Sequence, residues 1–502
     1  MWRPSHTGGR PTRPRRRALP ECRPMRSFLP LSVTAPTRFR VPFLTAALLA
    51  IPATGAWAAS PDGSPIAAPA TAAADGDAPP EPRVALHAQT TYVWQRKPAF
   101  DAAYTGPNSL VPTRERSYSF TATADLAVRP WEGGQLHFNP EAARGVPLSH
   151  LAGAGGLSNG ELARSSGSQL KAYRARLFWL QRWNAGGETE KIDADFNEMG
   201  GTATARRWTL VLGNVSLLDY FDPNPYAKDP REQFFNWSFL APGPWDYAAD
   251  ARGYTWAGIL EYRTPQWAVR GGRGLQPRES NGPKLDRAWQ RRYGDQIEAE
   301  SDLPVALPAG PLRGRVLWFR NRAVMGAFDD AVALGQAAGT VPDVGAVRRL
   351  QTKTGWAVTL EAPLGEDAGV FVRAGRSGGR QETFAFTEID RQLSVGGQWS
   401  GAAWGRPADR MGAALAVNGL SGGHRDYLAA GGQGAFLGDG ALNYGRERVW
   451  EVYYRAVMPP VPTAAGALHS AVSLGAQRIR NPGYNRDRGP VDIVSVRLHA
   501  EF

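Results

Sequence analysis

VSVRLHAEF, residues 494–502, is the stretch that decides the fold. Apolar and polar residues alternate through it with a period of two, the period at which successive side chains of a β-strand point to opposite faces. The apolar face would carry Val494, Val496, Leu498, Ala500 and Phe502, and the polar face would carry Ser495, Arg497, His499 and Glu501. The stretch therefore predicts a strand with one apolar and one charged face.

The same alternation recurs along the chain, and Gly, Pro, Asn and Asp separate its occurrences. Clear examples are residues 118–128, 173–179 and 450–458, and many such segments begin or end with Trp or Tyr. The longest apolar run after residue 83 is 413–417, far below the roughly 18 residues that a transmembrane helix needs. The pattern excludes helical membrane spanning and favours strands.

Two all-β architectures alternate in this way. A soluble β-sandwich sends its aromatic residues to the core, so it gives no reason for them to gather at strand ends. An outer-membrane barrel explains both features, because lipid requires an apolar outer band and aromatic rings settle at the two interfaces. About 420 residues at roughly 26 per strand and connection give about 16 strands, a size that encloses an aqueous lumen. The sequence predicts an all-β, transmembrane, outer-membrane antiparallel β-barrel.

The charge is concentrated in the first 58 residues. The 502 residues include 58 Lys and Arg against 46 Asp and Glu, a net charge of +12. Ten of the basic residues and one acid lie before residue 59, where Arg38 and Arg40 precede the apolar run 41–58, VPFLTAALLAIPATGAWA. This order is typical of a signal peptide cut after Ala58, although a membrane anchor would also be nearly long enough. Met25 is an alternative start.

Cleavage would leave a nearly neutral chain with three regions. Residues 1–58 form the leader with its cleavable signal peptide, 59–83 an Ala/Pro-rich flexible tether, and 84–502 the barrel domain. The mature chain would hold 48 basic and 45 acidic residues, so we expect no nucleic-acid partner. The single cysteine, Cys22, would leave with the leader, which excludes disulfides.

The sequence offers no enzyme or cofactor motif. It contains neither GxxxxGK[ST], HExxH nor GxSxG, and its histidines are not at metal-ligand spacing. We therefore expect no enzymatic activity, no cofactor and no metal site. A barrel lipid hydrolase stays open as a distant alternative, because the members of a Ser/His triad meet only in space.

Three segments carry a resemblance to a known family. They are HAQTTYVWQRKPAFDAAYTGPNSL (87–110), FNPEAARGVPLSHLAGAGGLSNGE (138–161) and LLDYFDPNPYAKDPREQFFNWSFLAPGPWDYAADARGYTW (217–256). They resemble the OprB-type carbohydrate-selective porin family. The resemblance implies a 16-stranded barrel in the outer membrane of a Gram-negative bacterium, with inward loops that narrow the lumen and passive diffusion of small, glucose-like sugars. Some members are linked to other small solutes such as manganese, and the motifs do not separate these subgroups.

Charged residues on strand faces opposite apolar residues are the candidates for the pore lining. Sugar hydroxyls need planar bidentate donors and carboxylate acceptors. The candidates are Arg174, Arg176, Arg270, Arg320, Arg373, Arg455, Arg497, Glu141, Glu361 and Glu451. For each arginine taken alone, a structural ion pair that stiffens the wall is the competing interpretation.

The segment from 219 to 252 is too rich in Asp, Asn, Trp and Tyr to be a minimal turn. A constriction loop folded into the lumen would include Asp219, Asp222, Asn224, Asp229, Trp245, Asp250 and Arg252. The alternative is a loop held together by its own Asp and Asn caps. The expected partners are small sugars, outer-membrane lipid and the barrel-assembly machinery, with a homotrimer as a possible assembly.

Overall fold

A computed structural model describes residues 81–162, 167–463 and 466–502. The expected leader, 1–58, and most of the expected tether, 59–83, lie outside these described residues. In the part of the chain that is described, no helix is long and apolar enough to cross a membrane.

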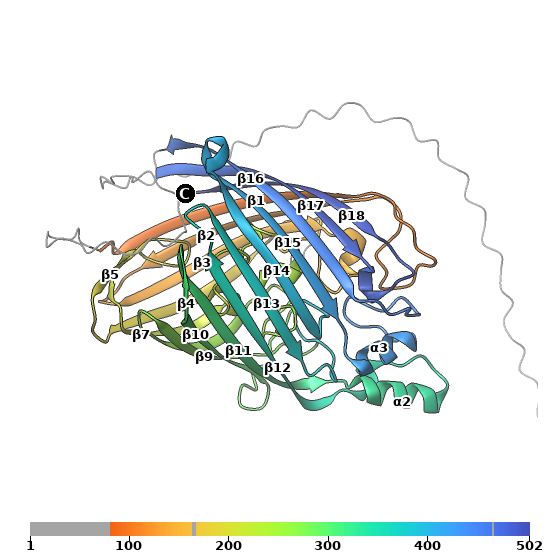
Figure 1. The fold of residues 1–502 in the computed structure, drawn as a ribbon. Helices are drawn as coiled ribbons and strands as arrows, with labels where there is room; N and C mark the ends of the chain where they lie inside the picture. Colours follow the sequence, from red (N-terminus) through yellow and green to blue (C-terminus); the bar gives the residue numbers. More distant parts are fainter. Residues whose placement is uncertain (1–80, 163–166, 464–465) are drawn as a thin grey trace, which may run out of the picture. The chain divides into compact units, whose positions relative to one another are not determined.

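Sixteen strands of the described chain close into one antiparallel barrel (Figure 1). Each strand pairs with its neighbour along the barrel, and β1 closes the ring against β18. The strands are β1 (Val84–Lys97), β2 (Glu115–Val128), β3 (Gly134–Val146), β4 (Lys171–Asn184), β7 (Arg207–Val215), β8 (Thr255–Arg263), β9 (Trp267–Leu275), β10 (Tyr293–Leu307), β11 (Gly310–Met325), β12 (Arg349–Pro363), β13 (Ala368–Ser377), β14 (Arg391–Gly401), β15 (Arg406–Gly419), β16 (Glu447–Thr463), β17 (Gly466–Arg480) and β18 (Val491–Glu501). The predicted fold class and strand number are confirmed.

The alternation of the last strand sets its two faces. Val494 and Leu498 of β18 are 47% and 48% exposed, whereas Arg497 is fully buried. Apolar side chains thus face outward, as lipid requires, and the polar ones face the interior. The register at the closing seam places Thr90 opposite Ala500 and Tyr92 opposite Leu498, so every edge is paired.

The two ends of the barrel differ. At the end where β1 begins and β18 ends, the strands are joined by short turns such as 264–266, 308–309 and 364–367. One connection there is longer, 185–206, and holds the hairpin β5 (Thr189–Ile192) and β6 (Gly201–Thr204). We call this end of the barrel the terminal end and the opposite end the loop end.

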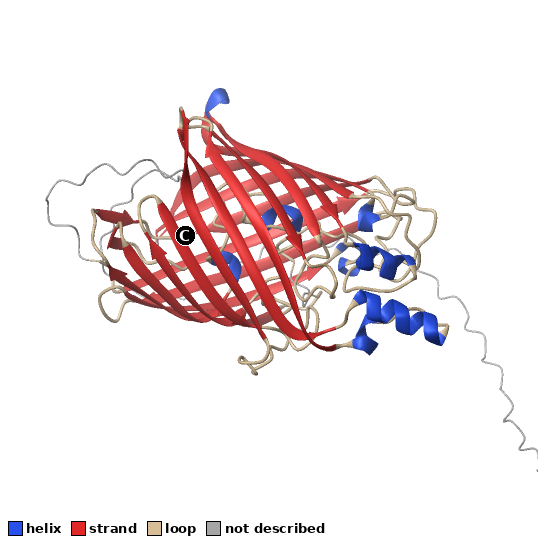
Figure 2. Ribbon diagram, turned by 60° about the horizontal axis from the view of Figure 1, so that its bottom comes forward, coloured by secondary structure: helices blue, strands red, loops and turns tan. Residues whose placement is uncertain are grey.

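The loop end carries the long connections, among them 147–170, 216–254, 326–348 and 420–446. They hold the short helices α1 (Trp237–Leu240), α2 (Phe328–Ala338) and α3 (Gly422–Ala429) and the 3-10 turns η1 (Leu148–Leu151), η2 (Leu217–Asp219), η3 (Val344–Val347) and η5 (Pro482–Tyr484); η4 (Ala402–Trp404) lies in a terminal-end turn. Figure 2 shows helical turns and loops inside the ring of strands. Ser421 caps α3 by accepting a hydrogen bond from the backbone N–H of His424, and Gly339 ends α2 at a φ of 64°.

The interior is a packed core rather than an empty tube. Loop residues Phe221 and Trp245 form one apolar cluster with the inward side chains Leu317 and Phe319 of β11. Part of the inward face of β11 is therefore apolar, because it packs against this loop.

Candidate functional site

The loop 216–254 crosses the lumen and is fastened to walls on several sides; we call it the inward loop. Arg373 of β13 donates to the carbonyl oxygens of Phe239 and Ala227, each at 2.6 Å. From another wall, the carboxylate of Glu451 on β16 accepts hydrogen bonds from the backbone N–H groups of Phe235 and Asn236. These inward side chains belong to two non-adjacent strands, so the segment that they both contact lies inside the barrel.

Fully buried arginines act as anchors of the inward loop. The guanidinium of Arg497 donates to the carbonyl oxygens of Pro230, Glu232 and Gln233 at 2.6–2.9 Å. Arg373 also pairs with Asp222 at 2.5 Å. Both arginines are 0% exposed, so they support the inward loop and have no surface open to a solute.

A second buried network stiffens the wall itself. Arg270 on β9 pairs with Glu261 and Glu300, and Arg315 on β11 joins Glu300 to Glu361 at 2.6–2.8 Å. Arg270 and Arg315 are 2% and 3% exposed. The structure thus brings the candidates Arg270 and Glu361 together as parts of one ion-pair chain across β8–β12.

The inward loop is also held together by its own caps. The Asn224 side chain accepts from the N–H groups of Tyr226 and Ala227, and Asp229 and Asp250 accept from N–H groups two residues ahead. Trp245 is buried, with its ring centroid 6.0 Å from Phe221 and 5.3 Å from Tyr247. Arg252 stacks on Tyr173 of the wall at 4.4 Å. The segment thus contacts the wall and is also held together by its own caps.

One ion pair of the inward loop is partly exposed. Arg176 of β4 forms a bidentate pair with Asp219 of η2, with N–O distances of 2.7 and 2.8 Å. Their side chains are 12% and 27% exposed, and the guanidinium lies 5.3 Å from the ring centroid of Tyr254. Nearby, the Glu141 carboxylate accepts from Thr123 and Tyr173 and pairs with Arg231 at 3.3 Å. A charged pair beside an aromatic ring is thus open to the lumen.

Further partly exposed pairs lie along the wall toward the terminal end. Arg182 of β4 pairs with Glu198 of the β5–β6 hairpin, and Arg263 pairs with Glu261 at 3.1 Å. These four side chains are 16–29% exposed. The hydroxyl of Tyr220 lies within reach of the charges of Asp219, Arg176, Glu198 and Arg182. We call Arg176–Asp219, Arg182–Glu198 and Arg263–Glu261, together with Tyr220 and Tyr254, the lumen file.

Two predicted pore-lining residues face outward instead. Arg174 lies 5.1 Å from the ring of Trp256, which is 43% exposed on the outer face, because the register of β3 and β4 shifts at residue 175. Arg320 of β11 shares its face with exposed Val316 and Trp318, and pairs with Asp295. The alternation pattern predicted that both arginines would line the pore, and at these two positions the prediction is wrong.

The remaining predicted residues and several missed ones face inward. Arg455 pairs with Glu232 of the inward loop at 2.6 Å. Asp246 was not predicted, yet it pairs with Lys353 at 3.0 Å and accepts from the backbone N–H groups of Phe384 and Ala385. Its place beside Trp245 in the aromatic-rich segment was the available signal. Arg182 and Glu198 gave none, because the hairpin that joins them interrupts the strand pattern.

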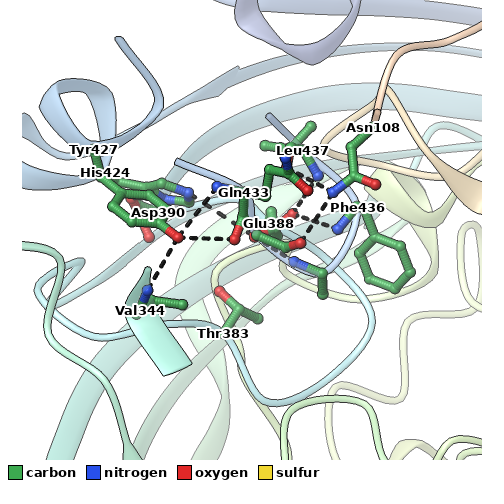
Figure 3. Close-up of polar contacts among 12 residues, drawn as sticks. Asn108, Val344, Thr383, Glu388, Asp390, His424, Tyr427, Gln433, Phe436 and Leu437 are labelled. Atoms are coloured by element: carbon green, nitrogen blue, oxygen red, sulfur yellow. Dashed lines mark hydrogen bonds and ion pairs between the residues drawn. The ribbon is translucent and has the colours of Figure 1, made fainter. Parts of the chain in front are cut away.

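At the loop end, a polar cluster fastens four connections to one another (Figure 3). The Glu388 carboxylate accepts from the N–H groups of Ala435, Phe436 and Leu437, and the Asp390 carboxylate lies 3.0 Å from Nδ1 of His424. Burial raises the pKa of Glu388 above its ordinary value, despite the charge of His424. For Asp390, burial also acts to raise the pKa, but the charge and hydrogen bond of His424 outweigh it and hold the pKa well below its ordinary range.

One group of possible metal ligands occurs among the described residues. Glu232, His499 and Glu501 each have a ligand atom within 4.8 Å of the others. Arg455 already neutralises Glu232, and His499 bonds to Thr91 through Nδ1 at 2.8 Å. Glu232 and His499 are thus already part of the contacts of the wall.

The comparisons with known proteins agree with this geometry. A family model described as "Carbohydrate-selective porin, OprB family" matches residues 112–502. The chain belongs to the OprB family. The high-pH structure of Pseudomonas putida OprB matches with a TM-score of 0.62 and 15% identity, covering 84% of this chain and 94% of that one. No curated protein matches the sequence.

Other outer-membrane structures match more weakly. A loop L8 deletion mutant of Vibrio cholerae OmpT has a TM-score of 0.41 and 11% identity, covering 84% of this chain and 99% of that one. Pseudomonas aeruginosa OccK11 has a TM-score of 0.38 and 11% identity, covering 84% and 95%. Family membership and barrel make this OprB-family porin a protein of the Gram-negative outer membrane, in a family and fold of non-enzymatic channels for carbohydrates.

Proposed function

We propose that this OprB-family porin mediates passive, selective diffusion of small, glucose-like sugars into the periplasm and catalyses no reaction. The observation that carries the proposal is the partly exposed, bidentate Arg176–Asp219 pair beside Tyr254, on the first turn of the inward loop. A solute that passes the inward loop at this turn meets planar donors, carboxylate acceptors and an aromatic ring together.

This combination suits a sugar. Vicinal hydroxyls match the two N–H groups of a guanidinium and the two oxygens of a carboxylate, while the apolar face of a pyranose ring slides on aromatic surface. Each arginine and each carboxylate of the lumen file already has an ion-pair partner, so a sugar exchanges hydrogen bonds without leaving a bare charge behind. Weak, exchangeable contacts favour diffusion over tight binding.

Charge balance in the lumen file favours neutral solutes over ions. Its three arginines are paired with three carboxylates at 3.1 Å or less, so little net potential remains for an ion to follow. A neutral polyhydroxylated solute needs no such potential.

The test is liposome swelling with the purified, folded chain. Vesicles that hold it should swell faster in glucose than in an amino acid of similar size, and Arg176→Gln should reduce the difference. The matched control is Arg291→Gln, which removes an exposed arginine from the loop 276–292 and should leave both rates unchanged. Equal rates in glucose and the amino acid would contradict selectivity and indicate a general porin.

A second candidate solute is manganese, and the Glu232, His499 and Glu501 group is the observation that favours it. Uptake of Mn²⁺ into vesicles loaded with a metal-sensitive dye would measure this directly. Uptake that exceeds that of Mg²⁺ and falls with His499→Gln would favour the metal over the sugar.

A further inference from the structure

Six arginines lie in three directly opposed pairs on the outer face of the barrel. All six side chains are exposed, and they alternate with outward apolar residues such as Val372 and Leu393. The register places Arg96 opposite Arg116, Arg376 opposite Arg391, and Arg448 opposite Arg480. We call these the arginine pairs.

All three arginine pairs lie at the loop end. Arg96 is one residue from the end of β1, Arg376 one residue from the end of β13, and Arg448 one residue from the start of β16. Their partners occupy the matching ends of β2, β14 and β17. The pairs therefore lie at the same end of three different strand pairs.

Directly opposed like charges destabilise a sheet, so the pairs need a counter-charge. Elsewhere on the same face the chain supplies one, because Asp295 lies 2.7 Å from both Arg273 and Arg320. Within residues 81–162, 167–463 and 466–502, none of the six paired arginines has an ion pair with a carboxylate. The described part of the chain therefore supplies no counter-charge for the arginine pairs.

Aromatic residues mark the boundary of the hydrocarbon next to each pair. Trp94 and Tyr118 face each other two positions below Arg96 and Arg116, and Trp356 lies opposite Arg376. Trp450 follows Arg448 by one outward position and is 37% exposed. Because Trp and Tyr settle at the membrane interface, the arginines beyond them lie at headgroup level.

The terminal end lacks this arrangement at the corresponding strands. There, the facing outward positions of β1 and β2 are aliphatic, as where Leu86 lies opposite Leu126. Barrels of this kind turn their longer loops to the cell exterior. The arginine pairs thus face one leaflet only, the outer one.

We propose that the arginine pairs are binding sites for the phosphate groups of phosphorylated lipids in the outer leaflet. Two guanidinium groups side by side offer several N–H donors, which suits the oxygens of a phosphate monoester. Lipid binding would cancel the repulsion within each pair. The same lipid chains would pack on the aromatic and aliphatic band below.

The test compares the full, folded chain with a variant in which each pair loses one member: Arg96→Gln, Arg376→Gln and Arg448→Gln. In phosphatidylcholine vesicles the variant should unfold at a higher temperature than the wild type, because repulsion is relieved. In vesicles that contain lipid A the order should reverse. The loss of one arginine should weaken the binding of lipid A at each site about fivefold. Native mass spectrometry of the retained lipid measures this binding.

The control removes the same charge from exposed loop arginines: Arg287→Gln, Arg291→Gln and Arg380→Gln. This control should retain as much lipid A as the wild type. The same stability order in both vesicles, or equal retention of lipid A by variant and wild type, would overturn the proposal. Equal protection of the wild type by free inorganic phosphate would also overturn it, because the site would then need no lipid.

Discussion

Arg373 of β13 and Asp222 of the inward loop form an ion pair with its closest atoms 2.5 Å apart and with side chains that are 0% and 2% exposed. The pair joins the wall to a segment about 150 positions earlier in the chain. Asp222 also accepts a hydrogen bond from the hydroxyl of Thr359 on β12, and its N–H donates to Glu298 on β10, so side chains from three strands contact this one residue. The position of the inward loop, and with it the width of the lumen, depends on this turn.

Replacing Arg373 with Met should therefore open the channel. The substitution leaves the Asp222 carboxylate buried and uncompensated, which costs about 3–5 kcal/mol. That cost destabilises the contact between the inward loop and the wall rather than the pairing of the strands, so the barrel should persist. Single-channel recordings should show higher conductance, while heat-modifiable migration in detergent gels is retained. Arg380→Met, in an exposed loop position, is the control. Unchanged conductance in a folded Arg373→Met barrel would contradict the anchoring role.

A steric change where β13 contacts the inward loop should also raise the conductance. Gly369 of β13 faces inward, and a Cβ built there would lie 2.0 Å from Cζ of Tyr226. Gly369→Ala should displace Tyr226 and raise conductance without removing any charge. Gly271→Ala is the matched control, because its Cβ would meet nothing closer than 3.8 Å. If both variants conduct like the wild type, Tyr226 does not help to hold the loop.

The fold could be predicted because lipid imposes a simple rule on strands. Wherever one face meets hydrocarbon and the other is polar, as in residues 494–502, alternation gives both the strand and its orientation. The rule fails where a loop covers the inner wall. In β11, Leu317 and Phe319 face inward into an apolar core while Val316 and Trp318 face lipid, so both faces are apolar and the orientation of Arg320 cannot be inferred.

The candidate site was predictable only in part for the same physical reason. Arg176 and Asp219 were both named, but their contact depends on how the inward loop enters the lumen, and strand periodicity carries no such information. The bulge at residue 175 reverses the direction of Arg174 by adding one residue to the strand. Arg182 contacts Glu198 because of the β5–β6 hairpin, which the alternation pattern does not predict.

The Arg176–Asp219 pair should also set ion selectivity, and replacing each of its two residues should shift the selectivity in opposite directions. Asp219→Asn leaves an unpaired cation in the lumen and should favour chloride over potassium. Arg176→Gln leaves an anion and should favour potassium. A charge about 4 Å away is worth about 1 kcal/mol in water, which corresponds to about a fivefold change in permeability ratio. Reversal potentials under a KCl gradient measure it.

The exposed pair Lys191–Asp193 supplies the control for this prediction. Its side chains are 83% and 81% exposed on the terminal-end hairpin, at 2.8 Å. Neither Lys191→Gln nor Asp193→Asn should move the reversal potential. Shifts of the same sign for Asp219→Asn and Arg176→Gln would show that the pair does not face the ion path.

Acidification should loosen the loop-end cluster through Asp390. Its pKa in the folded chain lies below the ordinary value of about 3.9, so its stabilising effect is complete above that value and is lost as the pH falls below it. Protection of the amides of 420–446 against hydrogen exchange, corrected for intrinsic rates, should be constant from pH 5 to about 4 on this account. Below that, the contribution of Asp390 should fall by about tenfold per pH unit.

Asp390→Asn isolates this contribution. The variant should be less protected than the wild type at pH 5, and the difference should shrink as the pH falls below about 3.9. Glu388 is present in both chains and lies near the same His424, so the comparison measures the Asp390–His424 pair together with its effect on Glu388. Asp426→Asn, on the exposed side of α3, should follow the wild type at every pH. A difference between wild type and Asp390→Asn that stays constant down to pH 2 would show that the Asp390 charge does not hold the cluster.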